Sequence, residues 1–148
     1  MPFSGAILIV EDDEADMFIL ERALRAAGLK NRLMHLTSAE EAMRYLASEG
    51  KYADRDLFPF PQMLITDCRT NVGSGLDLLR FMRETRNTRV VPTIFLTGSH
   101  KPGDIREAYE LGAHAFIIKT GDVEKFTCCI KTLVDFWTNC AEVPPCIV

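Results

Sequence analysis

Residues 63–69, with the sequence Met-Leu-Ile-Thr-Asp-Cys-Arg, form a short apolar run that ends on a single carboxylate, Asp67. An ionised carboxylate is costly to remove from water unless a cation, a metal or several hydrogen-bond donors offset the cost. Packing alone therefore does not explain an acid at the end of a buried strand. Two interpretations are open at this point: Asp67 either turns the chain or takes part in chemistry.

The composition is that of an ordinary globular chain. Its 148 residues are enough for one domain with a hydrophobic core. A formal net charge of −4, with acidic and basic residues interleaved, argues against a nucleic acid as the main partner. No apolar run approaches the roughly 20 residues of a membrane helix, and the first residues lack the pattern of a signal peptide. We therefore predict a cytoplasmic protein without a membrane or nucleic-acid partner.

The cysteine pattern also suggests the cytoplasm. The cysteines are odd in number and include no C-x-x-C pair, and no histidine stands near them at metal-ligand spacing. We predict that they are free thiols of a reducing compartment. They are Cys68, Cys128, Cys129, Cys140 and Cys146.

Apolar runs that predict strands alternate with amphipathic segments that predict helices. This alternation indicates an α/β fold, a flavodoxin-like doubly wound (βα)5 three-layer sandwich around a five-stranded parallel sheet. We expect one domain over residues 5–139 and a short C-terminal tail over 140–148, frayed beyond Pro144-Pro145, with an exposed, non-periodic loop over 51–61. The predicted strands are 6–10, 32–37, 62–66, 92–97 and 115–118, and the predicted helices begin near 14, 39, 75, 102 and 122, the last ended by Pro144-Pro145.

Polar side chains stand where the predicted strands end. In such folds ligands bind outside the carboxyl ends of the strands. Acids within about 4 to 6 Å of each other raise one another's pKa, so a cluster of them requires a cation. Oxygen ligands without histidine or thiolate suit a hard ion such as Mg²⁺. The residues at these ends are Glu11, Asp12 and Asp13 after the first strand, Asp67 after the third, Thr97 after the fourth and Lys119 after the fifth.

This set of groups suits a phosphoryl site. An Mg²⁺ beside Asp67 would leave coordination positions for an oxyanion, and Thr97 and Lys119 could supply a hydrogen bond and an ion pair to the same oxyanion. In such a site Asp67 is either a metal ligand only or the nucleophile that carries an acyl phosphate.

Four motifs, which together span almost the whole chain, resemble the receiver domain of two-component response regulators. Three shorter segments, residues 52–54, 109–113 and 135–137, further resemble the single-domain regulators paired with bacterial phytochromes. The four motifs are ILIVEDD at residues 7–13, Thr66-Asp67 followed by GLDLL at 75–79, PTIFLTG at 92–98 and LGAHAFIIK at 111–119.

The resemblance implies that a sensor histidine kinase, in the narrower match a bacterial phytochrome, phosphorylates Asp67. It implies that Glu11 and Asp12 are the acidic pair that binds Mg²⁺, with Asp67 and the backbone carbonyl of Arg69 as further ligands. It also implies that Lys119 pairs with the phosphoryl oxygens.

The same resemblance assigns switch and modulating roles. Thr97 is expected to move toward the phosphoryl group and Phe116 to swing inward behind it, while Arg69 and Ser99 are modulating positions. Because the related regulators commonly form homodimers, we also expect a dimer face that includes the last helix.

Three positions depart from the family pattern: Asn71 and Thr120 stand where proline is usual, and Arg69 stands where a small amide is common. Without proline at Asn71, the loop after the acceptor is freer. We predict that the Arg69 guanidinium folds over Glu11 or Asp13, or covers the path of the attacking water. Loss of phosphate should then be slower than in an Arg69→Asn variant.

Three alternatives to a phosphorylated signalling switch are open. A Mg-dependent aspartyl-phosphate phosphatase would place a general acid where Arg69 stands, and arginine cannot fill that role. A flavodoxin-like nucleotide binder would need a glycine-rich or hydroxyl-rich loop at residues 11–14, which are acidic. A non-phosphorylated pseudo-receiver would act through protein contacts alone. We favour the switch, and we do not expect a conventional enzyme.

Overall fold

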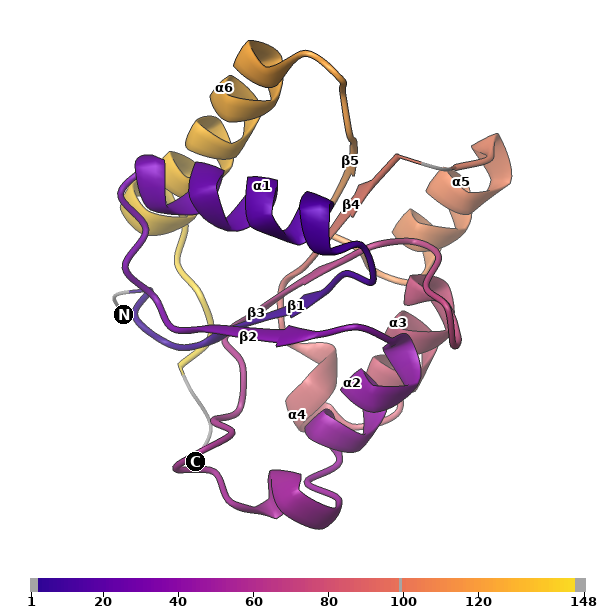
Figure 1. Cartoon of the computed structure of the whole chain (residues 1–148). Helices are drawn as coiled ribbons and strands as arrows, with labels where there is room; N and C mark the ends of the chain where they lie inside the picture. The colour runs from indigo at the N-terminus through magenta and orange to yellow at the C-terminus, as the bar shows by residue number, and fades with distance from the viewer. Residues whose placement is uncertain (1–2, 99, 146–148) are drawn as a thin grey trace.

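The computed structural model describes residues 3–98 and 100–145. They form one parallel sheet in the order β2-β1-β3-β4-β5 (Figure 1). This confirms the predicted doubly wound α/β fold and its five-stranded parallel sheet. The strands are β1 (Ile7–Val10), β2 (Leu33–Leu36), β3 (Met63–Thr66), β4 (Thr93–Thr97) and β5 (Ala115–Ile118).

The helices cover both faces of the sheet. Helices α1 and α6 lie on one face, and α2, α3 and α5 on the other (Figure 1). Among the described residues, no helix is long and apolar enough to cross a membrane. The bounds are α1 (Glu14–Ala26), α2 (Ala39–Leu46), the 3-10 turn η1 (Gly50–Ala53), α3 (Gly75–Arg83), the unpredicted short helix α4 (Arg86–Arg89), α5 (Pro102–Glu110), α6 (Val123–Asp135) and the π-helical turn η2 (Phe136–Cys140).

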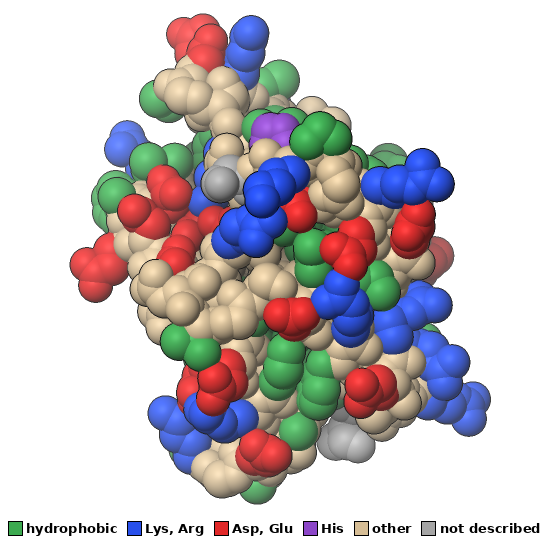
Figure 2. Space-filling model, turned by 90° about the vertical axis from the view of Figure 1, so that its right-hand side faces the viewer, with side chains coloured by type: hydrophobic (Ala, Val, Ile, Leu, Met, Phe, Trp, Pro, Cys, Tyr) green, Lys and Arg blue, Asp and Glu red, His purple; other side chains and the backbone are tan. Residues whose placement is uncertain are grey.

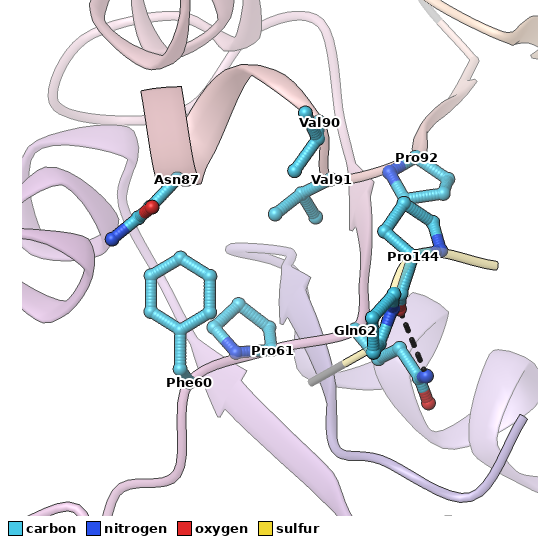
Figure 3. A pocket seen from close by; sticks show the side chains of 9 residues that line it. Phe60, Pro61, Gln62, Asn87, Val90, Val91, Pro92 and Pro144 are labelled. Carbon is cyan, nitrogen blue, oxygen red and sulfur yellow. Dashed lines mark hydrogen bonds between the residues drawn. The ribbon is translucent and has the colours of Figure 1, made fainter. Parts of the chain in front are cut away.

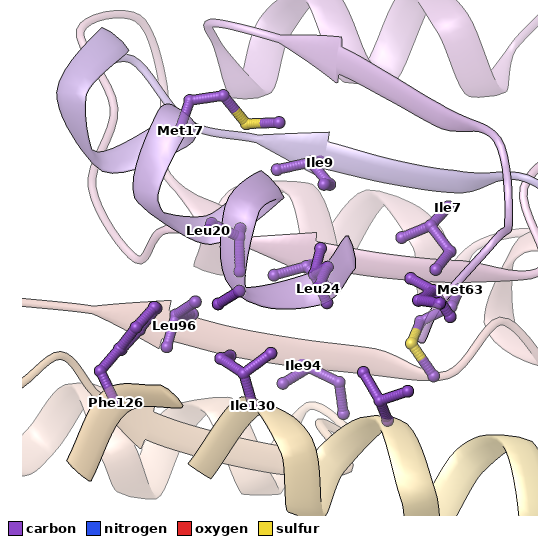
Figure 4. Close-up of a cluster of buried hydrophobic side chains, with 14 residues drawn as sticks. Ile7, Ile9, Met17, Leu20, Leu24, Met63, Ile94, Leu96, Phe126 and Ile130 are labelled. Carbon is purple, nitrogen blue, oxygen red and sulfur yellow. The ribbon is translucent and has the colours of Figure 1, made fainter. Parts of the chain in front are cut away.

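The three central strands are buried on both faces, as their continuous apolar runs predict. Figure 4 shows a cluster of buried hydrophobic side chains that brings strand residues such as Ile9 together with Leu24 of α1 and Ile130 of α6. Fully burying one such side chain contributes about 1.5 to 3 kcal/mol to folding. The core therefore fixes where each strand ends, and with it the position of the polar residues beyond.

Side-chain caps set the starts of the helices that follow the strands. Asp13 accepts a 2.9 Å hydrogen bond from the Asp16 amide at α1, and Ser38 accepts a 3.1 Å bond from the Glu41 amide at α2. A cap of this kind contributes about 1 kcal/mol. Only half of a capping box forms at Ser38, because the Glu41 carboxylate bonds Tyr52 and Arg44 and does not return to the cap.

The segment 51–61 is more ordered than the prediction of an exposed, non-periodic loop. Tyr52 in η1 is buried, with 3% of its surface exposed. Arg55 donates hydrogen bonds to the Phe58 carbonyl (3.0 Å) and the Tyr45 carbonyl (3.1 Å), and the Tyr45 hydroxyl donates to the Pro59 carbonyl (2.7 Å). These contacts fold the connection onto the end of α2.

The prediction that Pro144-Pro145 end the last helix is wrong, because the helix ends earlier and the residues that follow it are packed against the domain. The fraying predicted beyond the prolines falls outside the described residues. Helical structure ends at Cys140, before the two prolines, and Val143 is buried. Gln62 Nε2 donates a 3.2 Å hydrogen bond to the Pro144 carbonyl (Figure 3). Gln62 Oε1 accepts a 2.7 Å bond from the Gly5 amide. Gln62 thus ties both ends of the chain to the start of β3.

Candidate functional site

The parallel sheet brings the predicted polar residues to one edge. The backbone ladder continues one residue past the strands, since the Asp67 amide donates to the Val10 carbonyl (3.0 Å) and the Lys119 amide donates to the Thr97 carbonyl (2.8 Å). Asp67 therefore lies between the end of β1 and the end of β4.

Two other strand ends supply hydrogen-bond donors to Asp67. The Thr97 hydroxyl donates to Oδ1 at 2.6 Å, and Lys119 Nζ donates to Oδ2 at 3.3 Å. The Arg69 amide donates to Oδ1 at 3.3 Å. The side chain of Asp67 is 13% exposed, so the carboxylate is held firmly and remains open to solvent on one side.

The carboxylates of this edge are crowded. Glu11, Asp12 and Asp67 each offer an oxygen, and these oxygens lie within 4.8 Å of one another. Burial raises the pKa of Glu11 above its ordinary value, although bonds from Lys119 and the Asp13 amide partly offset the effect. Three hard oxygen donors at this spacing, without thiolate or imidazole, fit a divalent cation such as Mg²⁺.

Lys119 is the cation in hydrogen-bond contact with Asp67. Its ammonium pairs with Glu11, with Asp16 at 3.0 Å and with Asp67 at 3.3 Å. Burial lowers the pKa of Lys119, but the bonds to Glu11 and Asp16 and the charge of Asp67 outweigh burial and raise the pKa above its ordinary value. Lys119 therefore carries its charge at neutral pH.

Asp16 was not predicted as part of the site. It lies in the first turn of α1, directly after the acidic strand end. Its place in the sequence could have identified it as a site residue, because a helix that begins at a strand end turns its first residues toward the same edge.

The Arg69 guanidinium does not fold over Glu11 or Asp13, which was the first of its two predicted placements. Its Nη2 lies 3.0 and 3.2 Å from the two carboxylate oxygens of Asp104, the third residue of α5. The second placement, across the path of the attacking water, stays a prediction. Asp104 was also missed, because its contact depends on the path of the loop after β4. The site thus includes a second ion pair on the α5 side of Asp67.

Phe116 lies inward, against the core. Its ring stacks on Phe95 with the centroids 5.5 Å apart and the planes at 9°. The Phe116 amide donates a 3.2 Å hydrogen bond to the Tyr109 hydroxyl of α5. The movement of Thr97 and Phe116 on phosphorylation stays a prediction.

Gly75 explains why α3 begins where it does. Its amide donates a 2.9 Å hydrogen bond to the Cys68 carbonyl. A Cβ at this position would contact the Asp67 carbonyl oxygen and lie 2.9 Å from the Phe95 ring. Helix α3 therefore packs closely under the loop that follows Asp67 only because residue 75 has no side chain.

The remaining predicted positions contribute less to the site. Asn71 is exposed, Ser99 lies outside the described residues, and the described part of the chain has no cis peptide bond, including at Thr120. Burial raises the pKa of Cys68 to about 11, so this thiol stays protonated beside Asp67. The four cysteines of the described segments are all free.

The fold and the site define a doubly wound α/β protein with an acidic edge around one hydrogen-bonded aspartate. The sequence model of the response regulator receiver domain matches residues 7–131. The chain belongs to this family, and it is a response regulator receiver of two-component signalling. The narrower likeness to phytochrome-associated regulators is also confirmed by the relatives below.

The response regulator Rcp1 of Synechocystis sp. is 24% identical over 93% of this chain and 92% of its own. The structure of the phosphorylated cyanobacterial phytochrome response regulator RcpA is 25% identical, covers 96% of this chain and 99% of its own, and has a TM-score of 0.87. The Mn²⁺-bound form of Rcp1 has a TM-score of 0.85 over 95% of this chain and 99% of its own, at 24% identity. The bacteriophytochrome response regulator RtBRR is 30% identical, with a TM-score of 0.75 over 96% of this chain and 85% of its own.

Proposed function

We propose that Asp67 accepts a phosphoryl group from a phosphohistidine of a sensor histidine kinase, and that the chain signals through altered protein contacts. The observation that supports this most directly is the environment of the Asp67 carboxylate. The Thr97 hydroxyl and the Lys119 ammonium each bond one oxygen, and the acids Glu11 and Asp12 stand beside it.

The transfer needs little more than this geometry. A carboxylate oxygen of Asp67 attacks the phosphorus, the N–P bond breaks, and its electron pair stays on the imidazole, which takes up a proton. An O–P bond forms, and the acyl phosphate is the product. Lys119 neutralises charge on the phosphoryl oxygens, and Thr97 donates a hydrogen bond to one of them. Such a protein is a phosphorylated switch and not a turnover enzyme.

We propose Mg²⁺ as the cation of the site, held by the side chains of Glu11, Asp12 and Asp67 and by the backbone carbonyl of Arg69. Bound there, it would neutralise charge on the phosphoryl group. The local charge supports this assignment, since the ammonium of Lys119 pairs with the carboxylates of Glu11, Asp16 and Asp67. Asp12 adds a fourth carboxylate, which lies within 4.8 Å of those of Glu11 and Asp67.

A groove beside Lys119 is the surface we propose for kinase docking. It has a volume of about 210 Å³ and lies between Ile19 of α1 and Val123 of α6. Ile19, Val123 and the neighbouring Phe18 are 47%, 72% and 66% exposed. An exposed apolar surface next to the acceptor suits a helix that brings a histidine to Asp67. The likeness to RcpA and RtBRR supports a phytochrome as the kinase. A histidine kinase takes its phosphoryl group from ATP, and this supports the cytoplasm as the compartment.

A second apolar surface supports a homodimer. A groove of about 410 Å³ runs between α6 and the edge strand β5, lined by Ile117, Leu133 and Trp137. Phe136 at its rim is 51% exposed. In contrast, the face over α5, α3 and α2 carries acidic and basic side chains interspersed (Figure 2), in keeping with a protein partner. Sedimentation should show a dimer that Phe136→Asp weakens and Phe18→Asp leaves intact.

The acceptor assignment is tested with Mg²⁺ and a small phosphodonor such as acetyl phosphate. Mass spectrometry should show the gain of one phosphoryl group on the wild type and none on Asp67→Asn. Asp135→Asn, which changes an exposed aspartate of α6, is the matched control and should be modified like the wild type. A wild type that gains no mass would leave the pseudo-receiver as the better reading, and multiple turnover of phosphate esters would favour the phosphatase.

A further inference from the structure

Arg69 connects the phosphoacceptor to α5 through two separate contacts. Its backbone amide donates to Asp67 Oδ1 at 3.3 Å. Its guanidinium bonds both oxygens of Asp104 through Nη2, at 3.0 and 3.2 Å. Arg69 therefore links the Asp67 carboxylate to the first turn of α5, the helix that follows the loop after β4.

The two partners of this ion pair differ in their freedom to move. The side chain of Asp104 is 10% exposed, and its Oδ2 also accepts a 3.0 Å hydrogen bond from the Lys101 amide at the start of α5. The side chain of Arg69 is 49% exposed. A long, half-exposed arginine can change partner, whereas the buried, helix-capping carboxylate cannot leave its position without uncapping α5.

We propose that Asp104 is a positioning residue that holds the Arg69 guanidinium away from Asp67, and that phosphorylation draws the guanidinium from Asp104 to the phosphoryl oxygens. The proposal rests on Asp67 being the phosphoacceptor. An aspartate offers Arg69 one negative charge, whereas a phosphoryl group offers about −1.5 to −2 and three acceptor oxygens. Arginine binds such oxygens in pairs, so the competition favours the phosphoryl group.

The exchange would have consequences at both ends. Near Asp67, a guanidinium on the phosphoryl group covers the path of the attacking water and slows hydrolysis of the acyl phosphate. At α5, Asp104 loses its ion pair with Arg69 and keeps the hydrogen bond from the Lys101 amide that caps the helix. The same helix carries Tyr109, whose hydroxyl accepts the Phe116 amide, so its first turn is connected to the aromatic switch.

A double-mutant cycle tests the proposal. Purified protein is phosphorylated with acetyl phosphate and Mg²⁺, the donor is removed, and the remaining phosphoprotein is followed by mass spectrometry. Asp104→Asn frees Arg69 and keeps an oxygen to accept the Lys101 amide. It should lengthen the phosphate lifetime by roughly twofold to fivefold, the range of a partly exposed ion pair. Arg69→Asn should shorten the lifetime, and Asp104→Asn should then have no effect in the Arg69→Asn background.

Two controls separate this role from a general effect on folding. Asp77→Asn breaks the exposed pair between Asp77 and Arg80 on α3 and should leave the lifetime unchanged. Melting curves should show that all the variants are folded. Equal lifetimes of Asp104→Asn and wild type, a shorter lifetime of Asp104→Asn, or the same effect of Asp104→Asn in both backgrounds would overturn the proposal. A wild type that takes up no phosphoryl group would instead refute the acceptor assignment itself.

Discussion

The hydroxyl of Thr97 donates a 2.6 Å hydrogen bond to Oδ1 of Asp67, so the last residue of β4 directly contacts the residue that follows β3. Thr97 is fully buried and its backbone is held in the sheet. The hydroxyl is therefore oriented by the fold and needs no further ordering to bond the Asp67 carboxylate. The role that we propose for it in phosphorylation can be tested separately from its contribution to packing.

Thr97→Val replaces the hydroxyl with a methyl group of similar size. A hydrogen bond to a charged group contributes about 1.5 kcal/mol or more, so we expect roughly a tenfold slower phosphorylation by acetyl phosphate. Thr97→Ser keeps the hydroxyl and should stay close to the wild-type rate. Rates are measured by mass spectrometry over time, and a valine variant as fast as the wild type would show that the bond does not serve the reaction.

Two glycines near helix starts should respond in opposite ways to alanine. Gly75→Ala places a methyl group against the Asp67 carbonyl and the Phe95 ring and should cost about 1 to 3 kcal/mol. Gly103→Ala, in the first turn of α5, meets nothing within 4 Å and should stabilise the protein by about 0.5 to 1 kcal/mol, because alanine is the better helix former. Urea unfolding of both variants measures the difference, and equal changes would contradict the close packing under the loop that follows Asp67.

The strands and the site edge could be predicted because they depend on short-range patterns. Residues 7–10 are a continuous apolar run, and parallel strands necessarily place Glu11, Asp67 and Lys119 at one edge. These inferences need no knowledge of side-chain direction. Once the order of the elements was correct, the main residues of the site followed from it.

The partners of those residues could not be predicted in the same way. That Arg69 meets Asp104 depends on how the two loops after β3 and β4 pass each other, and Arg69 has several acids within reach. Helix α4 has four residues and no apolar period, so its pattern was too short to read. The burial of Tyr52 depends on its contacts with Tyr45 and Phe58 across a turn of the chain, which leave no helical or strand periodicity in the sequence.

The docked tail predicts a specific loss of stability. Val143 is 4% exposed, and Val143→Ala should cost about 1 to 2 kcal/mol through lost apolar burial. Val123→Ala changes a valine of α6 that is 72% exposed and should have little effect. The free energy of unfolding in urea compares the two, and a Val143→Ala variant as stable as the wild type would show that the tail is loose in solution.

His114 should make folding sensitive to mild acid. Its Nδ1 accepts a 3.2 Å hydrogen bond from the Thr93 amide, and its ring lies 6.2 Å from that of Trp137. Partial burial of the imidazole lowers the pKa of His114 below its ordinary value, although part of the residue is exposed. The unfolded chain therefore binds the proton more readily than the folded one. The stability that His114 contributes is present above the ordinary pKa and is lost as the pH falls through the ordinary value toward the lowered one.

His114→Asn keeps an oxygen that can accept the Thr93 amide but does not titrate. Between about pH 8 and about pH 5, the range in which histidine changes charge, we expect the wild type to lose more stability than this variant. Urea unfolding at a series of pH values gives the two curves, and comparing their slopes cancels the carboxylates that both proteins share. Parallel curves would mean that His114 keeps its ordinary pKa in the folded state, and that the groove beside Trp137 does not exclude the charged ring.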